Sequence, residues 1–155
     1  MTASKLPKVQ LTKVFRQALI DDGLYPDDFA QYFAEWKQAW PRHELTDFYF
    51  GKDGDYKKPL RHGKRVLRHV HLAPTEDSPD YDEWCRKANR GSRKTSDEIL
   101  VYAEDRTHGF LLLYIAREPT GHELGDMATP ITRQLMNDLA EVAEAFIHNG
   151  SIISI

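Results

Sequence analysis

Histidines are the residues of this sequence best suited to chemistry, and two of them form a close pair, His69-Val-His71. Successive side chains of a β-strand alternate between its two faces, so residues i and i+2 project together. The segment 64–73 is a predicted strand, which would present both imidazoles on one face. Such a pair can exchange protons with a phosphodiester, or supply two ligands of a metal site. Two partly buried histidines bonded to backbone carbonyls are the purely structural alternative.

The metal interpretation has a specific form. Gly63, His69-x-His71 and Glu76 follow the spacing that opens the cupin metal motif, but Glu83 stands where the motif needs its closing glycine. The second half of the motif has only a distorted counterpart before His122. A cupin barrel also needs more strands than this sequence offers. These departures argue against a cupin; no cofactor is expected, and a metal site built on the two histidines stays an alternative.

Positive charge is concentrated in the middle of the chain. Between residues 52 and 94, twelve Lys or Arg stand against seven Asp or Glu, whereas the whole chain has a net charge of -3. No acidic residue interrupts 84–94, and Thr95 and Ser96 follow directly. Basic and hydroxyl side chains contact phosphate groups, so this pattern predicts a localised anion-binding surface. Ordinary solvated surface charge would give the same composition.

A third histidine, His122, lies in a segment rich in Gly and Pro that follows the most apolar stretch of the chain. Arg117 precedes it and Asp126 follows it. A loop at the end of a sheet is a frequent position for catalytic side chains, so His122 is a further candidate for acid–base chemistry. An unremarkable surface histidine is the alternative.

The elements that must position these residues predict an α+β domain. Strands are expected over 9–19, 64–73, 97–104 and 110–117, the last being the most apolar and therefore central. Segments 48–55, 74–94 and 118–128 are predicted loops. The result is a single domain over 1–155, with a small, curved, mostly antiparallel sheet of about four strands.

Two helices complete the predicted fold. The first opens at Pro26 and ends at Pro41, with one aromatic face that suits core packing: Phe29, Tyr32, Phe33, Trp36 and Trp40. The second is long and C-terminal, with Thr129-Pro130 at its start and Asn149-Gly150 at its end.

Composition sets the expected compartment. The single cysteine, Cys85, excludes an intrachain disulfide and makes the cytoplasm the default location. The N-terminal residues 1–13 lack the apolar core of a signal peptide. The longest apolar run, 110–116, is too short to span a bilayer, so no membrane association is expected.

Taken together, the motifs resemble the YafO family of type II toxin–antitoxin toxins, in the family's order and close to its spacing. The resemblance covers about two-thirds of the chain, roughly 50–146. It rests on Phe50-Gly-Lys-Asp-Gly-Asp-Tyr56, His69-Val-His-Leu-Ala73, Lys94-Thr-Ser-Asp-Glu98, Leu100-Val-Tyr102, Leu111-Leu-Leu-Tyr-Ile115, His122, Asp126 and Leu139-Ala-Glu-Val-Ala-Glu-Ala-Phe146. The chain departs from RelE-like toxins in its acidic net charge and in its long segment between Ala73 and Thr95.

The resemblance implies a RelE/ParE-like fold and a messenger RNA endoribonuclease that acts with the ribosome, blocks translation and is silenced by a co-expressed antitoxin. It implies cleavage without metal: the 2′-hydroxyl attacks the adjacent phosphate, assisted by a general base, a general acid and nearby cations. We expect His71 and His69 to be base and acid, with His122 competing for either role. Asp97 would orient a histidine or a lysine, or simply cap a turn, and the expected phosphate-binding residues are Arg68, Arg93, Lys94, Thr95 and Arg117.

Two other function classes stay open on sequence grounds. One is a metal-dependent enzyme built on His69, His71 and Glu76, with His122 as a further ligand. The other is a non-enzymatic binding module whose basic middle meets an acidic partner.

Overall fold

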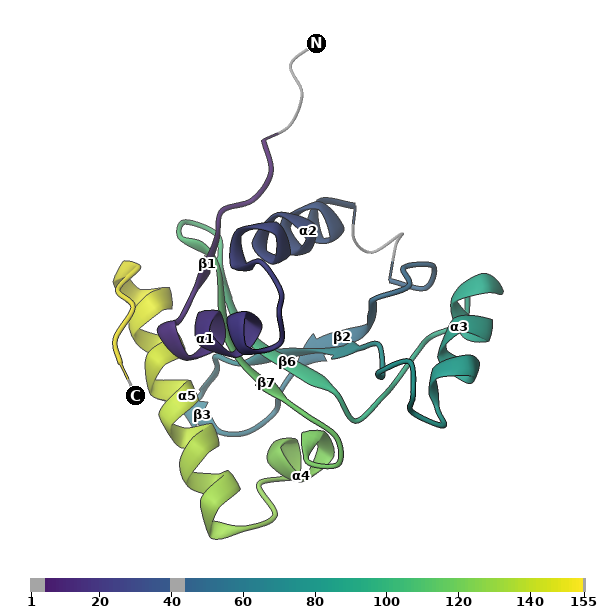
Figure 1. The fold of residues 1–155 in the computed structure, drawn as a ribbon. Coiled ribbons are helices and arrows are strands. Elements are labelled where there is room, and N and C mark those ends of the chain that lie inside the picture. Colours follow the sequence, from purple (N-terminus) through teal and green to yellow (C-terminus); the bar gives the residue numbers. More distant parts are fainter. Residues whose placement is uncertain (1–4, 40–43, 155) are drawn as a thin grey trace.

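The computed structural model describes residues 5–39 and 44–154 (Figure 1). Its helices are α1 (Lys13–Asp21), α2 (Pro26–Ala39), α3 (Tyr81–Asn89), α4 (Gly121–Asp126) and α5 (Pro130–Asn149). Its strands are β1 (Val9–Leu11), β2 (Phe50–Asp55), β3 (Leu60–Arg61), β4 (Lys64–Arg65), β5 (Arg68–Leu72), β6 (Ile99–Asp105) and β7 (Gly109–Ala116). The expected α+β class and the long C-terminal helix are confirmed.

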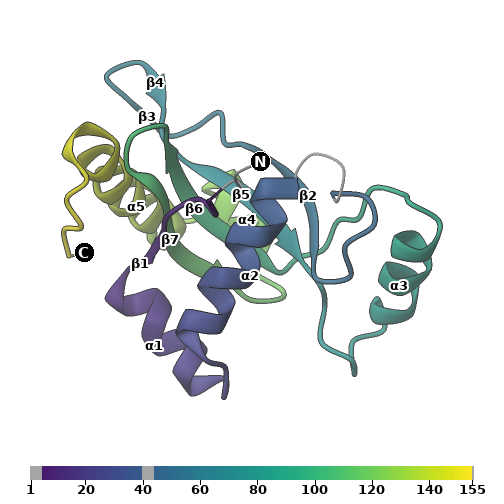
Figure 2. The ribbon, with the colours of Figure 1, turned by 90° about the horizontal axis from the view of Figure 1, so that it is seen from above.

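The main sheet has five strands in the order β1-β7-β6-β5-β2. All neighbours are antiparallel except β1, which runs parallel to β7. The predicted central strand, β7, is therefore second from the edge, and β6 occupies the middle. Strands β3 and β4 form a separate hairpin that extends beyond the main sheet (Figure 2).

Helices cover both faces of the sheet, and each face has its own core. On one face, α1 and α2 pack Phe15, Leu19 and Phe33 against inward side chains of the strands. On the other, α5 packs Leu139 and Phe146 against the alternate side chains of β6 and β7. Successive side chains of a main-sheet strand therefore point alternately to these two faces. This alternation decides which polar side chains share a face.

The N-terminal strand prediction was wrong beyond Leu11. Thr12 ends β1 and caps α1, because its hydroxyl accepts a hydrogen bond from the Phe15 N–H at 3.1 Å. The same hydroxyl donates to the Leu113 carbonyl at 3.0 Å, which ties the cap to β7. At this position, the side-chain hydrogen bond of an N-cap threonine stabilises the start of a helix by more than its β propensity favours a longer strand.

Three predicted loops contain regular structure: β2 lies in 48–55, α3 in 74–94 and α4 in 118–128. The predicted strand 64–73 is divided into β4 and β5. Between them Val66 and Leu67 turn into the core beneath α5, where they are 8% and 1% exposed. A continuous strand could bury only one of two consecutive side chains on that face, so the ladder breaks there.

The helix boundaries that carry local signals were predicted well. Helix α2 begins at Pro26, and Phe29, Phe33 and Trp36 on its predicted aromatic face are buried. Trp40 and Pro41 lie outside the described residues. Helix α5 has the predicted Thr129 N-cap and ends with Gly150 in the left-handed conformation, at a φ of 78°. No helix in the described ranges is long and apolar enough to cross a membrane.

Candidate active site

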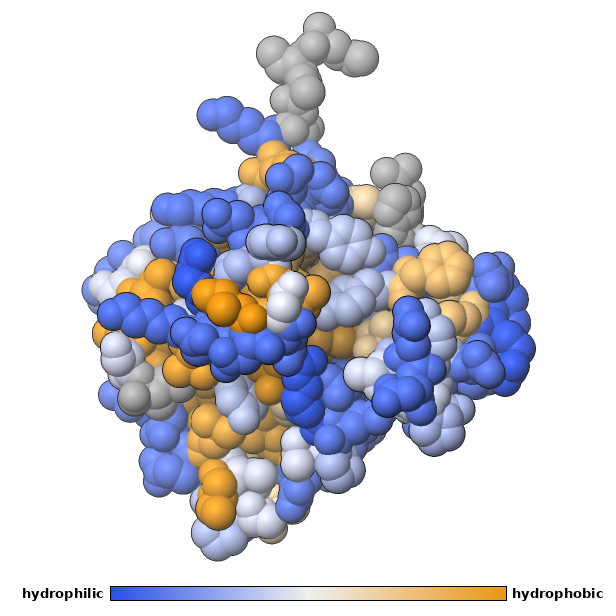
Figure 3. Space-filling model, viewed as in Figure 1, coloured by the Kyte–Doolittle hydropathy of each residue, from blue (hydrophilic) through white to orange (hydrophobic). Residues whose placement is uncertain are grey.

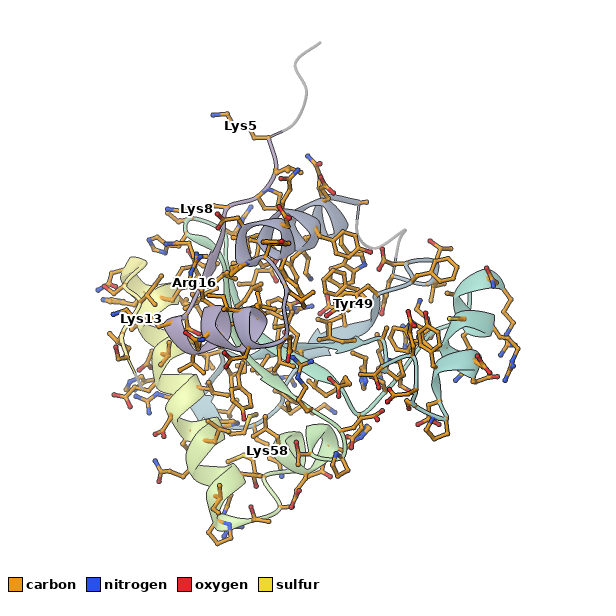
Figure 4. The ribbon with its side chains drawn as sticks, in the orientation of Figure 1. Lys5, Lys8, Lys13, Arg16, Tyr49 and Lys58 are labelled. Atoms are coloured by element: carbon orange, nitrogen blue, oxygen red, sulfur yellow. The ribbon has the colours of Figure 1, made fainter. Side chains whose placement is uncertain are left out.

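A groove of about 770 Å³ opens on the α5 side of the sheet, between β2, β5 and α4. It brings together all three candidate histidines, His69, His71 and His122. The remaining lining residues are Lys52, Asp55, Tyr56, Lys57, Lys58, Thr95, Ile99, Gly121, Gly125 and Asp126. Figure 4 shows Lys58 beside α4, on the far side of the sheet from α1. The groove is therefore the place where the sequence-predicted chemistry converges.

Strand β5 places His69 and His71 on the same face, as its alternation predicted. Val70 and Leu72 point to the opposite face and are buried in the core beneath α1 and α2. The two imidazole centroids lie 5.8 Å apart. The two histidines therefore project from one face, as predicted, but their rings have different environments.

The ring of His71 is held by the backbone of Ser96. Its Nδ1 lies 2.7 Å from the Ser96 carbonyl oxygen, and in the other tautomer, with the proton on Nε2, it accepts a hydrogen bond from the Ser96 N–H at 3.0 Å. A proton on Nδ1 would be donated to that carbonyl, which leaves the lone pair of Nε2 for a substrate. Burial lowers the pKa of His71 and favours the neutral ring. A neutral imidazole in this tautomer is suited to accept a proton.

The ring of His69 is stacked on Tyr56, with centroids 4.1 Å apart and planes 19° from parallel. Its Nδ1 is buried and has no hydrogen-bond partner among the described residues. Burial, with a smaller contribution from His71, lowers the pKa of His69 to about 4. The ring is therefore uncharged near neutral pH, and it is packed more tightly than a proton donor requires.

His122 lies in the first turn of α4 and is hydrogen-bonded to Asp97. The Asp97 Oδ1 accepts hydrogen bonds from both the backbone N–H and the Nδ1 of His122, each at 2.6 Å. The side chain is 66% exposed, and its ring centroid lies 6.0 Å from that of His71. Asp97 thus contacts a histidine of the groove, as predicted, although its orienting role stays a prediction.

Gly121 allows this contact, because α4 approaches the start of β6 very closely. A Cβ at Gly121 would lie 2.2 Å from the Asp97 carbonyl oxygen and 2.7 Å from Ile99 Cγ1. Only a glycine fits there without moving the helix. The position of His122 over the groove therefore depends on a residue that has no side chain.

Three lysines give the groove its positive charge, and sequence reasoning assigned none of them a role. Lys52 extends from β2, and Lys57 and Lys58 follow that strand. The Lys58 ammonium donates to the Asp126 carbonyl at 2.9 Å and so connects this segment to the end of α4. The excess of basic residues over 52–94 indicated an anion-binding surface that includes these lysines. Their positions could not be predicted, because the sequence suggested a loop where β2 lies.

The comparison with known families can now be set beside this geometry. The model described as Toxin YafO, type II toxin-antitoxin system, matches residues 34–148, about three quarters of the chain. The chain belongs to this toxin family. No curated protein and no solved structure matches it. Membership in the family makes the protein a type II toxin and implies a cognate antitoxin as its partner, and the matched segment contains every residue that lines the groove.

Of the five predicted phosphate-binding residues, Thr95 lines the groove and is exposed. Lys94 does not reach it, because its side chain is fully buried. The Lys94 ammonium donates to the carbonyl oxygens of Glu44 and Leu45, at 3.2 and 3.0 Å. These bonds satisfy a buried charge and anchor the segment before β2, so Lys94 has a structural position in this toxin.

The three predicted arginines also lie away from the groove. Arg68 points to the opposite face of β5, where it donates to Asp55 Oδ1 at 2.6 Å and to the Tyr102 hydroxyl at 3.1 Å. Arg117 pairs with Asp22 and with Glu98. Arg93 is exposed in the segment before β6 and does not line the groove. Alternation along β5 explains why Arg68 points away from the groove. Arg117 lies away from it because it pairs with Asp22 and Glu98.

The metal-site hypothesis loses its carboxylate ligand. Glu76 lines a separate hollow with Arg117 and Tyr81, away from His69 and His71. Within 5–39 and 44–154, no group of three or more His, Cys, Asp or Glu is arranged to hold a metal ion. The cupin-like spacing in the sequence is therefore not matched by a cluster of ligands.

Proposed function

We propose that this toxin is an endoribonuclease that cleaves messenger RNA at the ribosome and so blocks translation. The observation that carries the proposal is the proximity of His71 and His122 in a groove that Lys52, Lys57 and Lys58 also line. Two imidazoles and several cations around one concave site meet the needs of phosphodiester transfer. The association with the ribosome rests on the family resemblance.

In the proposed reaction, His71 is the general base. Its Nε2 takes the proton of the ribose 2′-hydroxyl, whose oxygen attacks the adjacent phosphorus. The neutral state favoured by burial and the Nδ1 contact with Ser96 both suit this role. The bond from the 2′-oxygen to phosphorus forms as the bond to the 5′-oxygen breaks, which leaves a 2′,3′-cyclic phosphate.

His122 is the proposed general acid and protonates the departing 5′-oxygen, giving a 5′-hydroxyl end. The attacking and leaving oxygens of such a displacement lie on opposite sides of phosphorus, so base and acid must face each other across it. The ring centroids of His71 and His122 lie 6.0 Å apart in one groove, so both imidazoles are within reach of the same bound phosphodiester. His69, neutral and stacked on Tyr56, is assigned to supporting His71.

The lysines stabilise the extra negative charge of the pentacoordinate phosphate. Neither Lys52 nor Lys57 forms an ion pair with a described residue, so both ammonium groups are available to a substrate. Lys58 is already held by Asp126 and would bind phosphate from a fixed position. Thr95 adds a hydroxyl donor on the same side. The proposed chemistry uses no metal.

The test is single-turnover cleavage of a ribosome-bound messenger RNA by the wild type and by the variants His71→Ala and His122→Ala. We expect each to lose about 10²–10⁴-fold in rate. His148→Ala is the matched control, because His148 is exposed on α5 and lies outside the groove. Wild-type rates in both groove variants would refute the site, and intact messenger RNA with wild-type protein would refute the function. Stoichiometric metal in the purified protein would contradict metal independence.

A further inference from the structure

The segment that leads out of the groove is strongly basic and contains no acid. Residues 57–75 include six Lys or Arg and three His, and the first acidic residue after Asp55 is Glu76. The β3–β4 hairpin forms the middle of this segment and extends away from the main sheet (Figure 2). Its charge is therefore continuous in sequence with Lys57 and Lys58, which line the groove.

The hairpin is held firmly in place. His62 and Gly63 form its tip with positive φ angles of 51° and 74°, the conformation of a tight two-residue turn. Arg61 donates to Glu144 of α5 at 2.9 Å, and His62 Nε2 lies 3.3 Å from the same carboxylate. These contacts fix the hairpin against α5 and neutralise Arg61.

The other strand of the hairpin carries its uncompensated charge. Lys64 and Arg65 are both exposed, and neither side chain forms an ion pair or hydrogen bond with a described residue. The second basic segment of the protein differs, because on α3 both Arg86 and Arg90 pair with Glu83. Free positive charge therefore lies on the hairpin more than on α3.

The hairpin surface suits a polyanion better than a protein. Leu60 is its one exposed large apolar side chain in the described structure. By contrast, the face that carries α1 shows hydrophobic patches at its surface, where Val14, Ile20 and Leu24 are 48%, 51% and 45% exposed (Figure 3). Protein interfaces bury apolar and aromatic anchors, whereas RNA backbones are bound by unpaired Lys and Arg.

We propose that the β3–β4 hairpin binds the sugar–phosphate backbone of the RNA strand outside the cleaved phosphate, with Lys64 and Arg65 each contacting a phosphate. This inference rests on the proposed function, because it extends the same RNA path from the groove. The hairpin contributes affinity and positioning, and it takes no part in bond cleavage.

The test measures binding of a fluorescent 2′-O-methyl RNA of about 16 nucleotides, which cannot be cleaved, at a series of salt concentrations. Each phosphate contact to a single strand contributes about 0.7 to the slope of log Kobs against log salt. The double variant Lys64→Gln/Arg65→Gln should therefore bind more weakly, with a slope shallower by about 1.4. Lys8→Gln/Lys13→Gln is the matched control, since both lysines are exposed and belong to neither the hairpin nor the groove.

An unchanged slope in the hairpin variant, an equal change in the control, or no salt-dependent binding by the wild type would overturn the proposal. So would loss of antitoxin binding with an unchanged RNA slope, because the hairpin would then be a protein interface. Circular dichroism checks folding, and the single variants, each expected to change the slope by about 0.7, provide a second test. RNA that is bound through the hairpin but never cut would refute the proposed function alone.

Discussion

Replacing Gly121 by alanine tests whether the approach of α4 to β6 positions His122. The added Cβ would lie 2.2 Å from the Asp97 carbonyl oxygen and 2.8 Å from the Asp97 carbonyl carbon, both backbone atoms that cannot rotate away. Ordinary contact begins at 3.4 Å, so α4 must retreat by about 1.2 Å. That movement pulls His122 away from Asp97 and from His71.

Two measurable effects follow. Overpacking of this kind costs about 1–3 kcal/mol, which for a chain of this size lowers Tm by roughly 2–12 °C. A displacement of about 1 Å in a catalytic group costs roughly 10²-fold in rate. Calorimetry measures the first effect, and single-turnover cleavage of ribosome-bound messenger RNA measures the second.

Gly54→Ala is the matched control. A Cβ at Gly54 meets no atom within 4 Å, and the residue lies in β2 near the groove. This variant should keep the wild-type Tm and rate. If Gly121→Ala also kept both, the close packing of α4 would not matter for His122. A lower Tm with an unchanged rate would refute the proposed role of His122 and leave the packing argument intact.

Three further predictions concern individual side chains. Lys94→Met should lower stability by about 1–3 kcal/mol, because the carbonyls of Glu44 and Leu45 lose their donor, while KM for RNA stays unchanged; a raised KM at unchanged Tm would show instead that Lys94 binds substrate. Asp97→Ala should reduce cleavage by about 10²–10⁴-fold without weakening the binding of 2′-O-methyl RNA, because His122 loses its orienting acceptor; a wild-type rate would argue against that role. Stability should fall as the pH decreases from about 6.5 towards about 4, because the depressed pKa of His69 makes the unfolded chain take up protons first. Thermal melts of His69→Gln should show a smaller fall over that range than the wild type, and identical profiles would contradict the cause given for the shift.

Local patterns in the sequence determined a large part of the fold and the first half of the site. Alternation in 68–72 places His69 and His71 on one face, because backbone geometry alone fixes that relation. The Thr129 cap and Gly150 define α5 for the same local reason. The order of the motifs was enough to predict the family, which the family match confirms.

Tertiary packing decided what local patterns cannot express. His122 meets His71, about fifty residues away in sequence, only because Gly121 lets α4 rest on the start of β6. Lys94 was a predicted phosphate ligand because of its residue type. Its side chain is buried, however, and its ammonium donates to backbone carbonyls. Charge in a sequence indicates which residues can bind phosphate, but the direction of each side chain depends on which long-range contact satisfies it.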